Sequence, residues 1–110
     1  MGSTPGSIPG IPETDGERLI EVFTRYPGVK KVVLYGSRAK GTHAPASDID
    51  LCIVGSEIDL RTELQIEREI DDLLLPYMID LSVYEKIDNV NLREHIDRVA
   101  VTVFEQRVTA

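Results

Sequence analysis

Two short segments of this chain share one pattern, an apolar strand with acidic residues on its other face. Residues 48–54 read DIDLCIV and residues 78–84 read MIDLSVY, with apolar and polar side chains in alternation. Because successive side chains of a strand point to opposite faces, one face of each segment is apolar and the other carries carboxylates. Two such strands predict a sheet that is covered on its apolar face and accessible on its acidic face.

One further strand and three helices complete the expected order of elements. The β-branched run VKKVVLY at 29–35 predicts a strand. Apolar residues at helical spacing predict helices over about 15–26, over about 60–75 and from about 91 onward through Phe104. The order is typical of an α/β (α+β) sandwich, a small mixed sheet with helices on one face. The strand residues expected to face the helices are Ile49, Leu51, Ile53, Ile79, Leu81 and Val83.

The composition limits the class of protein. Of 110 residues, 42% are hydrophobic and 28% charged, as in an ordinary globular domain. Twelve Lys and Arg against nineteen Asp and Glu give a net charge of −7, which disfavours direct nucleic-acid binding through a basic face. No apolar run reaches the roughly 20 residues that span a bilayer, so no membrane contact is expected. Cys52 has no second cysteine to pair with, which fits a reducing compartment and predicts a cytoplasmic location.

The chain is expected to divide into a short leader and one folded domain. Residues 1–13, MGSTPGSIPGIPE, are rich in Gly, Pro and Ser and lack the cationic start and apolar segment of a signal peptide. They are expected to form a disordered leader, and residues 14–110 the domain. The sequence leaves open whether this leader is native or was introduced during cloning.

Asp48 and Asp50 are the first candidates for a functional site. Residues two apart on a strand lie about 6.8 Å apart on the same face, where two carboxylates repel by roughly 2 kcal/mol at an effective dielectric near 20. Asp80, on a later strand, would add a comparable repulsion. Clustered carboxylates suit Mg²⁺ or Mn²⁺, which take one or two of them and further oxygens from substrate phosphates. The acids therefore predict a divalent-metal site that a nucleotide helps to complete.

The segment YGSRAKG at 35–41 offers a matching site for phosphate. Glycine at a strand end lets a phosphate approach the backbone closely, and Ser37 adds a hydroxyl donor. If SRAK begins a short helix, its first amides face the same anion, and Arg38 or Lys40 can neutralise phosphate oxygens. A phosphate cradle beside a metal site is what two-metal phosphoryl or nucleotidyl transfer requires.

Plainer interpretations of the same residues exist. Acids on the exposed face of a strand are usually just solvated, and surface cations such as Arg38 and Lys40 need no function. His43 is expected on a loop surface beside the phosphate site. Cys52 is expected to act as a small hydrophobe, although it shares the acidic face of its strand. The combination of the glycine-serine pair with Asp80 favours the functional interpretation.

The motif resembles that of the DNA polymerase beta-like nucleotidyltransferases. The pair GS at 36–37 is followed, after ten residues, by DID at 48–50, and Asp80 lies in a later strand. The short length and the wording YGSRAKG, SDIDL and IDL are most similar to the minimal nucleotidyltransferase (MNT) group within that superfamily. This resemblance extends over nearly all of residues 14–110.

The resemblance implies a role for each of these residues. Residues 36–37 would hold the β- and γ-phosphates of ATP or another nucleoside triphosphate. Asp48 and Asp50 would bind two Mg²⁺ ions, and Asp80 would complete the second metal site and help to deprotonate the attacking hydroxyl. Lys40 stands where an arginine is common in the group, which keeps the charge but loses a bidentate fork.

The resemblance also implies a partner protein. Larger relatives carry a further domain that holds the nucleobase and the acceptor, and a chain of this length has no room for one. Members of the minimal group are encoded beside a helical HEPN ribonuclease toxin, and some act as antitoxins by transferring AMP onto it. The expected function is therefore that of a Mg²⁺-dependent adenylyltransferase acting on a protein such as a HEPN toxin.

Other functions remain open at this point. A binding module that neutralises its partner by complex formation would retain the nucleotide pocket only for regulation. A small-molecule nucleotidyltransferase of the aminoglycoside-modifying kind is disfavoured because an acceptor domain is missing, and template-directed DNA synthesis is disfavoured by charge and size. Homodimerisation is compatible with so small a sheet, and the sequence reveals neither the nucleotide nor the acceptor.

Overall fold

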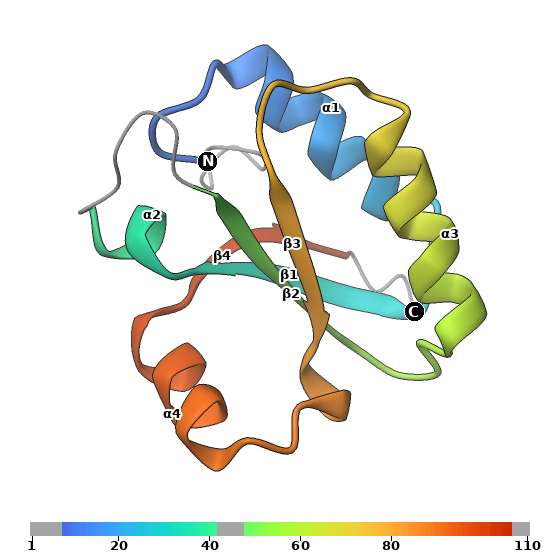
Figure 1. Cartoon of the computed structure of the whole chain (residues 1–110). Coiled ribbons are helices and arrows are strands. Elements are labelled where there is room, and N and C mark those ends of the chain that lie inside the picture. Colours follow the sequence, from blue (N-terminus) through green and yellow to red (C-terminus); the bar gives the residue numbers. More distant parts are fainter. Residues whose placement is uncertain (1–7, 42–47, 107–110) are drawn as a thin grey trace.

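A four-stranded mixed sheet forms the centre of the fold (Figure 1). The computed structural model describes residues 8–41 and 48–106. The strand order is β3-β2-β1-β4, in which β2 and β3 run parallel and β1 is antiparallel to both β2 and β4. The predicted small mixed sheet is confirmed. In chain order the elements are α1 (Glu13–Phe23), β1 (Val29–Tyr35), α2 (Ser37–Lys40), β2 (Ile49–Gly55), α3 (Leu60–Asp71), β3 (Ile79–Val83), the 3₁₀ turn η1 (Tyr84–Lys86), α4 (Val90–Val99) and β4 (Val101–Glu105).

Helices α1 and α3 cover one face of the sheet and enclose the main core. On this face lie alternate residues of the two central strands, such as Leu34 of β1 and Leu51 of β2, which are 0% exposed. Phe23 of α1 and Ile66 of α3 are also 0% exposed and belong to the same cluster. Removing such side chains from water is the main force that holds the two helices on the sheet. The six strand residues expected on this face all lie in or against this core.

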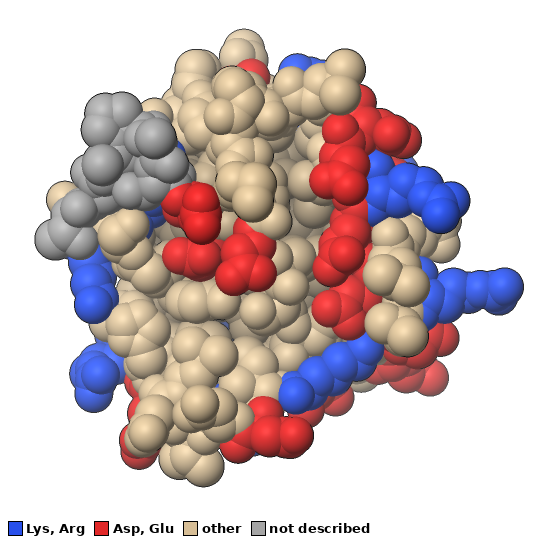
Figure 2. Space-filling view, viewed as in Figure 1, with Lys and Arg blue, Asp and Glu red and all other residues tan. Residues whose placement is uncertain are grey.

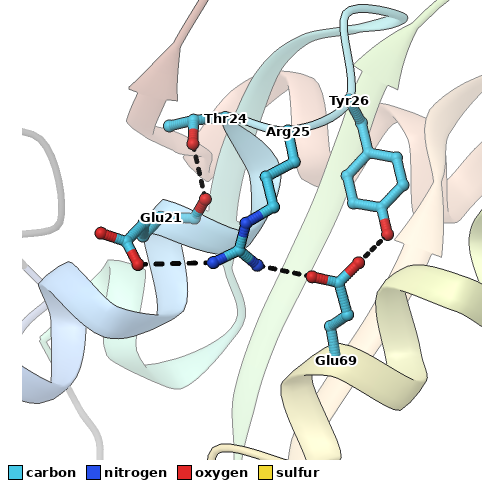
Figure 3. Close-up of polar contacts among 5 residues, drawn as sticks. All are labelled: Glu21, Thr24, Arg25, Tyr26 and Glu69. Atoms are coloured by element: carbon cyan, nitrogen blue, oxygen red, sulfur yellow. Dashed lines mark hydrogen bonds and ion pairs between the residues drawn. The ribbon is translucent and has the colours of Figure 1, made fainter.

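Polar contacts join the end of α1 to α3 (Figure 3). Arg25 donates a hydrogen bond from Nη1 to Glu69 Oε1 at 2.5 Å, and the hydroxyl of Tyr26 donates to the other oxygen of the same carboxylate. Arg25 also lies 3.5 Å from a carboxylate oxygen of Glu21, one turn earlier in α1. Burial, and then the hydrogen bond to Glu69, raise the pKa of Tyr26 to about 12. One glutamate therefore fixes the position of α3 against the end of α1.

The longest helix, α3, begins and ends at local signals. The side chain of Asp59 caps its first turn by accepting a hydrogen bond from the Thr62 amide at 2.8 Å. The helix ends at Asp71, earlier than the predicted end before Pro76, and Leu74 adopts a left-handed φ of 55°. In the described part of the chain, no helix is long and apolar enough to cross a membrane.

Helix α4 lies on the other face of the sheet, which corrects the expectation that all helices share one face. Ile96 of α4 is 2% exposed and packs with Val33, Tyr35 and Cys52. These strand residues alternate with those of the main core, so the second face of the sheet is partly apolar. The sequence pattern drew attention to the acids on this face. The apolar residues on the same face are covered by α4.

The last element is a strand, and the prediction of one helix from about 91 through Phe104 is wrong. Helix α4 ends at Val99, and the residues of β4 pair antiparallel with β1, Phe104 opposite Val32. The run VTVFE is rich in β-branched and aromatic residues, which favour strands. Phe104 then stacks on Phe23 of α1, with ring centroids 6.5 Å apart. Packing at the free edge of β1 decided the conformation.

The expectation of a disordered leader over 1–13 is wrong for its last residues. Ile8 is 4% exposed and belongs to the main core, and the amide of Ile11 donates a hydrogen bond to its carbonyl at 3.3 Å. Helix α1 then begins at Glu13. Ile8 lies in the main core and Ile11 packs against it, so the folded domain extends back to residue 8. Residues 1–7 lie outside the described part of the chain.

Candidate functional site

The pairing of β2 with β3 brings the predicted acids together. In this parallel ladder Asp50 lies directly opposite Asp80, and residues opposite each other in a ladder project from the same face. Asp48 precedes β2 by one residue and Asp50 by two. Asp50 is partly buried, whereas Asp48 and Asp80 are exposed. Figure 2 shows acidic side chains gathered in this region of the surface, close to where β2 begins.

The electrostatics of Asp50 reflect its burial and the charges of Asp80 and Asp48. Burial raises the pKa of the Asp50 carboxyl, and the charges of Asp80 and Asp48 raise it further. Each of these causes disfavours the ionised form. A cation held between the three side chains would relieve the repulsion.

Gly36 forms the turn that closes the site on its other side. Its φ of 79° and ψ of −157° are a conformation that side chains other than glycine's rarely adopt. A Cβ atom on Gly36 would lie 2.3 Å from Oδ2 of Asp50. The backbone of β1 at its end therefore lies directly against the central carboxylate. Glycine is required here by this close approach, in addition to any phosphate contact that the sequence predicts.

The described carboxylates are not preorganised as a complete set of metal ligands. Among residues 8–41 and 48–106, no group of three or more His, Cys, Asp or Glu side chains is arranged to hold a metal ion. The donor chemistry nevertheless fits a hard divalent cation, because such ions take a few carboxylate oxygens and complete their shell with phosphate and water oxygens. The roles of Asp48, Asp50 and Asp80 as metal ligands remain predictions.

The cations of the glycine-rich segment lie in different environments. The predicted short helix SRAK is present as α2, with Gly41 in a left-handed conformation after it. Lys40 is exposed, whereas Arg38 is 1% exposed. Arg38 donates a hydrogen bond from Nη1 to the carbonyl of Pro9 at 2.8 Å. The contact of Arg38 with phosphate stays a prediction, and the burial of Arg38 does not favour it. His43 lies outside the described residues.

Two polar residues beside the acids were not singled out by their sequence pattern. The hydroxyl of Tyr35 shares a hydrogen bond with that of Ser82, with the two oxygens 3.3 Å apart. Burial raises the pKa of Tyr35, the hydrogen bond to Ser82 lowers it, and the charges of Asp80 and Asp50 raise it. Tyr35 is the register partner of Asp50, so only knowledge of the β1–β2 pairing would have placed it at the site.

A mixed sheet with acids on two adjacent parallel strands, next to a tight glycine turn, is the arrangement of a nucleotidyltransferase-type domain. The sequence matches the family described as Polymerase beta, Nucleotidyltransferase over residues 17–108, and the chain belongs to this family. No curated protein matches the sequence.

Several solved structures with a similar fold come from toxin-antitoxin complexes. A chain of a toxin-antitoxin complex with AMP-PNP is 17% identical with a TM-score of 0.67, and the match covers 83% of this chain and 73% of that one. A chain of the MntA-HepT toxin-antitoxin is 13% identical with a TM-score of 0.64, covering 86% and 74%. A chain from the complex of a tri-AMPylated Shewanella oneidensis HEPN toxin with an MNT antitoxin is 14% identical with a TM-score of 0.64, covering 86% and 72%. At these identities the likeness establishes a common fold.

Proposed function

We propose that this chain is a Mg²⁺-dependent nucleotidyltransferase that transfers AMP from ATP to a hydroxyl of a protein, with a HEPN toxin as the partner. One observation carries the proposal: the register of β2 and β3 sets Asp50 opposite Asp80, while the Gly36 turn lies against Asp50. The carboxylates and the glycine turn thus meet where β1 ends and where β2 and β3 begin. Carboxylates beside a glycine turn fit a substrate that brings both a metal ion and a polyphosphate.

Asp48, Asp50 and Asp80 would hold the metal in this proposal. Bound there, Mg²⁺ would supply positive charge that stabilises the phosphate oxygens and lowers the pKa of the attacking hydroxyl. The exposed carboxylates of Asp48 and Asp80 are accessible to substrate, and the partly buried Asp50 fixes the centre of the set. Burial raises the pKa of Asp50, the charges of Asp80 and Asp48 raise it further, and a bound cation would remove that repulsion.

The other residues orient the triphosphate and move the proton. The turn at Gly36 and Ser37 receives the β- and γ-phosphates, and the exposed Lys40 neutralises part of their charge. Asp80 helps to remove the proton from the acceptor hydroxyl, whose oxygen attacks the α-phosphorus. The bond from that phosphorus to the bridging oxygen breaks, and pyrophosphate leaves with the electron pair. The product is an AMP ester of the acceptor.

The choice of a protein acceptor has two supports. The neighbouring folds occur in toxin-antitoxin complexes, one with AMP-PNP and one with a tri-AMPylated HEPN toxin. The net charge of −7 suits a basic protein surface better than a nucleic acid. A protein partner would supply the acceptor surface that this small domain lacks.

The test is transfer of label from α-labelled ATP with Mg²⁺ to a HEPN protein encoded beside this chain. The control is the Asp48→Asn/Asp50→Asn variant, which preserves size and removes both negative charges. We expect label on the partner only with the unmutated chain, and a mass increase of the partner that matches AMP. Equal labelling by the variant would refute the assignment of the acids.

A second function, a non-catalytic antitoxin that acts by complex formation, is favoured by one observation. A chain of the MntA-HepT toxin-antitoxin complex has a similar fold, and binding to a partner is all that this second function requires. Neutralisation of the partner without nucleotide, and without a change in its intact mass, would establish this function in place of transfer.

A further inference from the structure

Arg38 is the only buried charged residue in the part of the chain that the structure describes. It is 1% exposed and ranks first by volume among the fully buried side chains. Burying a guanidinium is costly unless its donors are paired, and breaking such pairing usually destabilises the fold strongly. A site that needed only a phosphate-binding cation would place it at the surface, as Lys40 is placed. The burial of Arg38 therefore points to a different task.

The contacts of Arg38 reach two segments far from it in sequence. Its Nη1 donates to the carbonyl of Pro9 at 2.8 Å, next to Ile8, which is buried in the main core. Its guanidinium carbon lies 5.8 Å from the centroid of the Tyr77 ring, within the range of a cation–π contact. Arg38 thus joins α2 both to the segment before α1 and to the segment before β3.

The segment before β3 and α2 itself both connect to the candidate site. Tyr77 is followed by Met78, whose carbonyl accepts a hydrogen bond from the amide of Ile49 at 2.8 Å, where β2 and β3 begin to pair. Helix α2 is joined to the glycine turn by the amide of Lys40, which donates to the carbonyl of Gly36 at 3.2 Å. Because a Cβ on Gly36 would collide with Asp50, small shifts of this turn change the space beside the carboxylate.

We propose that Arg38 is a positioning residue, which sets the Gly36–Ser37 turn against Asp50 by fastening α2 to Pro9 and Tyr77. It acts from behind the turn and does not touch the nucleotide. Residues 8–11 are then part of the support of the nucleotide site, although they precede the first helix. The effect on nucleotide binding rests on the proposed function, whereas the effect on the turn does not.

Amide hydrogen exchange of the full-length, nucleotide-free chain tests the positioning directly. We expect Arg38→Met to accelerate exchange at residues 37–41 by about tenfold, with exchange in β2 unchanged. Arg38→Lys should behave nearly as Arg38→Met, because an ammonium group lacks the planar fork that donates to Pro9 while lying over the Tyr77 ring. Arg61→Met, which removes an exposed arginine of α3, is the matched control and should change nothing at residues 37–41.

Ile8 tests the connection to the first segment. Ile8→Ala removes buried contacts at the segment that receives the Arg38 hydrogen bond, and it should also accelerate exchange at residues 37–41. In the double variant Arg38→Met/Ile8→Ala the acceleration should fall short of the product of the two single effects, because both changes release the same contact. Independent, multiplicative effects would refute the connection.

Binding of Mg²⁺ with AMP-PNP, measured by calorimetry, completes the experiment. We expect Arg38→Met to weaken binding by about tenfold, the consequence of a turn that is seldom in the binding conformation. Weaker binding with unchanged exchange at residues 37–41 would overturn the proposal, because Arg38 would then contact the nucleotide itself. Faster exchange throughout β2 in all the Arg38 and Ile8 variants would also overturn it in favour of a general role in stability. If the unmutated chain binds no nucleotide but the exchange pattern holds, the proposed function fails and the positioning stands.

Discussion

At Gly36, a single added side-chain atom would disturb both the fold and the candidate site. Gly36→Ala introduces a Cβ at 2.3 Å from Asp50 Oδ2 and a strained φ of 79°, and we expect it to cost roughly 1–3 kcal/mol of unfolding free energy and to abolish nucleotidyl transfer. Gly41→Ala is a matched control, because Gly41 has a similar φ of 78° and, among the described residues, no atom within 4 Å of its added Cβ. It should cost about 1 kcal/mol and retain transfer. Urea unfolding and the labelling assay measure both, and equal activity of the two variants would contradict this account.

Asp50 illustrates an opposition between function and stability at one residue. Asp50→Asn removes a partly buried charge that lies beside Asp48 and Asp80, so in the presence of a chelator it should raise the unfolding free energy by roughly 0.5–1 kcal/mol. Added Mg²⁺ with AMP-PNP should stabilise the unmutated chain by mass action and leave the variant unchanged. Thermal unfolding under the two conditions measures both effects. A variant that is stabilised by Mg²⁺ as much as the unmutated chain would exclude Asp50 as a ligand.

Cys52 is expected to be chemically inert in the folded chain. It is 0% exposed in the interior strand β2, and burial raises the pKa of its thiol to about 11. Because the thiolate is the reactive form, a disulfide reagent at pH 8 should modify the native chain only as fast as it unfolds. The same reagent in denaturing urea should react at once with one thiol per chain. Rapid reaction in native buffer would show that β2 opens locally.

At the scale of elements, the contact between α1 and α3 has a pH dependence of known sign. The pKa of Tyr26 is raised to about 12, so the folded state favours its neutral form more than the unfolded state does. The stabilisation is fully present below pH 10 and is lost as the pH rises from about 10 to 12. Tyr26→Phe should make the fall of unfolding free energy over this range less steep. Chemical unfolding at a series of pH values tests this, and identical slopes would refute a role for the Tyr26–Glu69 contact.

Helices and strands could be predicted where the local sequence pattern matches the environment of the element in the folded protein. The strands at 29–35, 48–54 and 78–84 formed nearly as expected, because their alternation and β-branched residues already require a half-buried sheet. The last element did not, since the spacing through Val103 and Phe104 satisfies a helix as well as a strand. Pairing with the edge of β1 favoured the strand, and that partner is distant in sequence.

At the scale of the whole molecule, the two faces of the sheet have separate roles. One face carries α1 and α3 and the main core, and the other carries the acids together with α4 and its smaller apolar cluster. Figure 2 shows acidic side chains at the candidate site and a further row of them along α3, so negative charge extends beyond the site on this side of the molecule. A basic partner surface that approaches the site would meet favourable charge over a wide area.

The sequence by itself determined the residues of the candidate site and the two acidic strands that carry them. The glycine-serine pair, Asp48, Asp50 and Asp80 could be named from spacing, because alternation along a strand is a local property. The tertiary structure alone decided that Asp50 faces Asp80, that Gly36 lies against Asp50, and that Arg38 turns inward to Pro9. These are contacts between segments distant along the chain, and their register and burial depend on how the whole core packs.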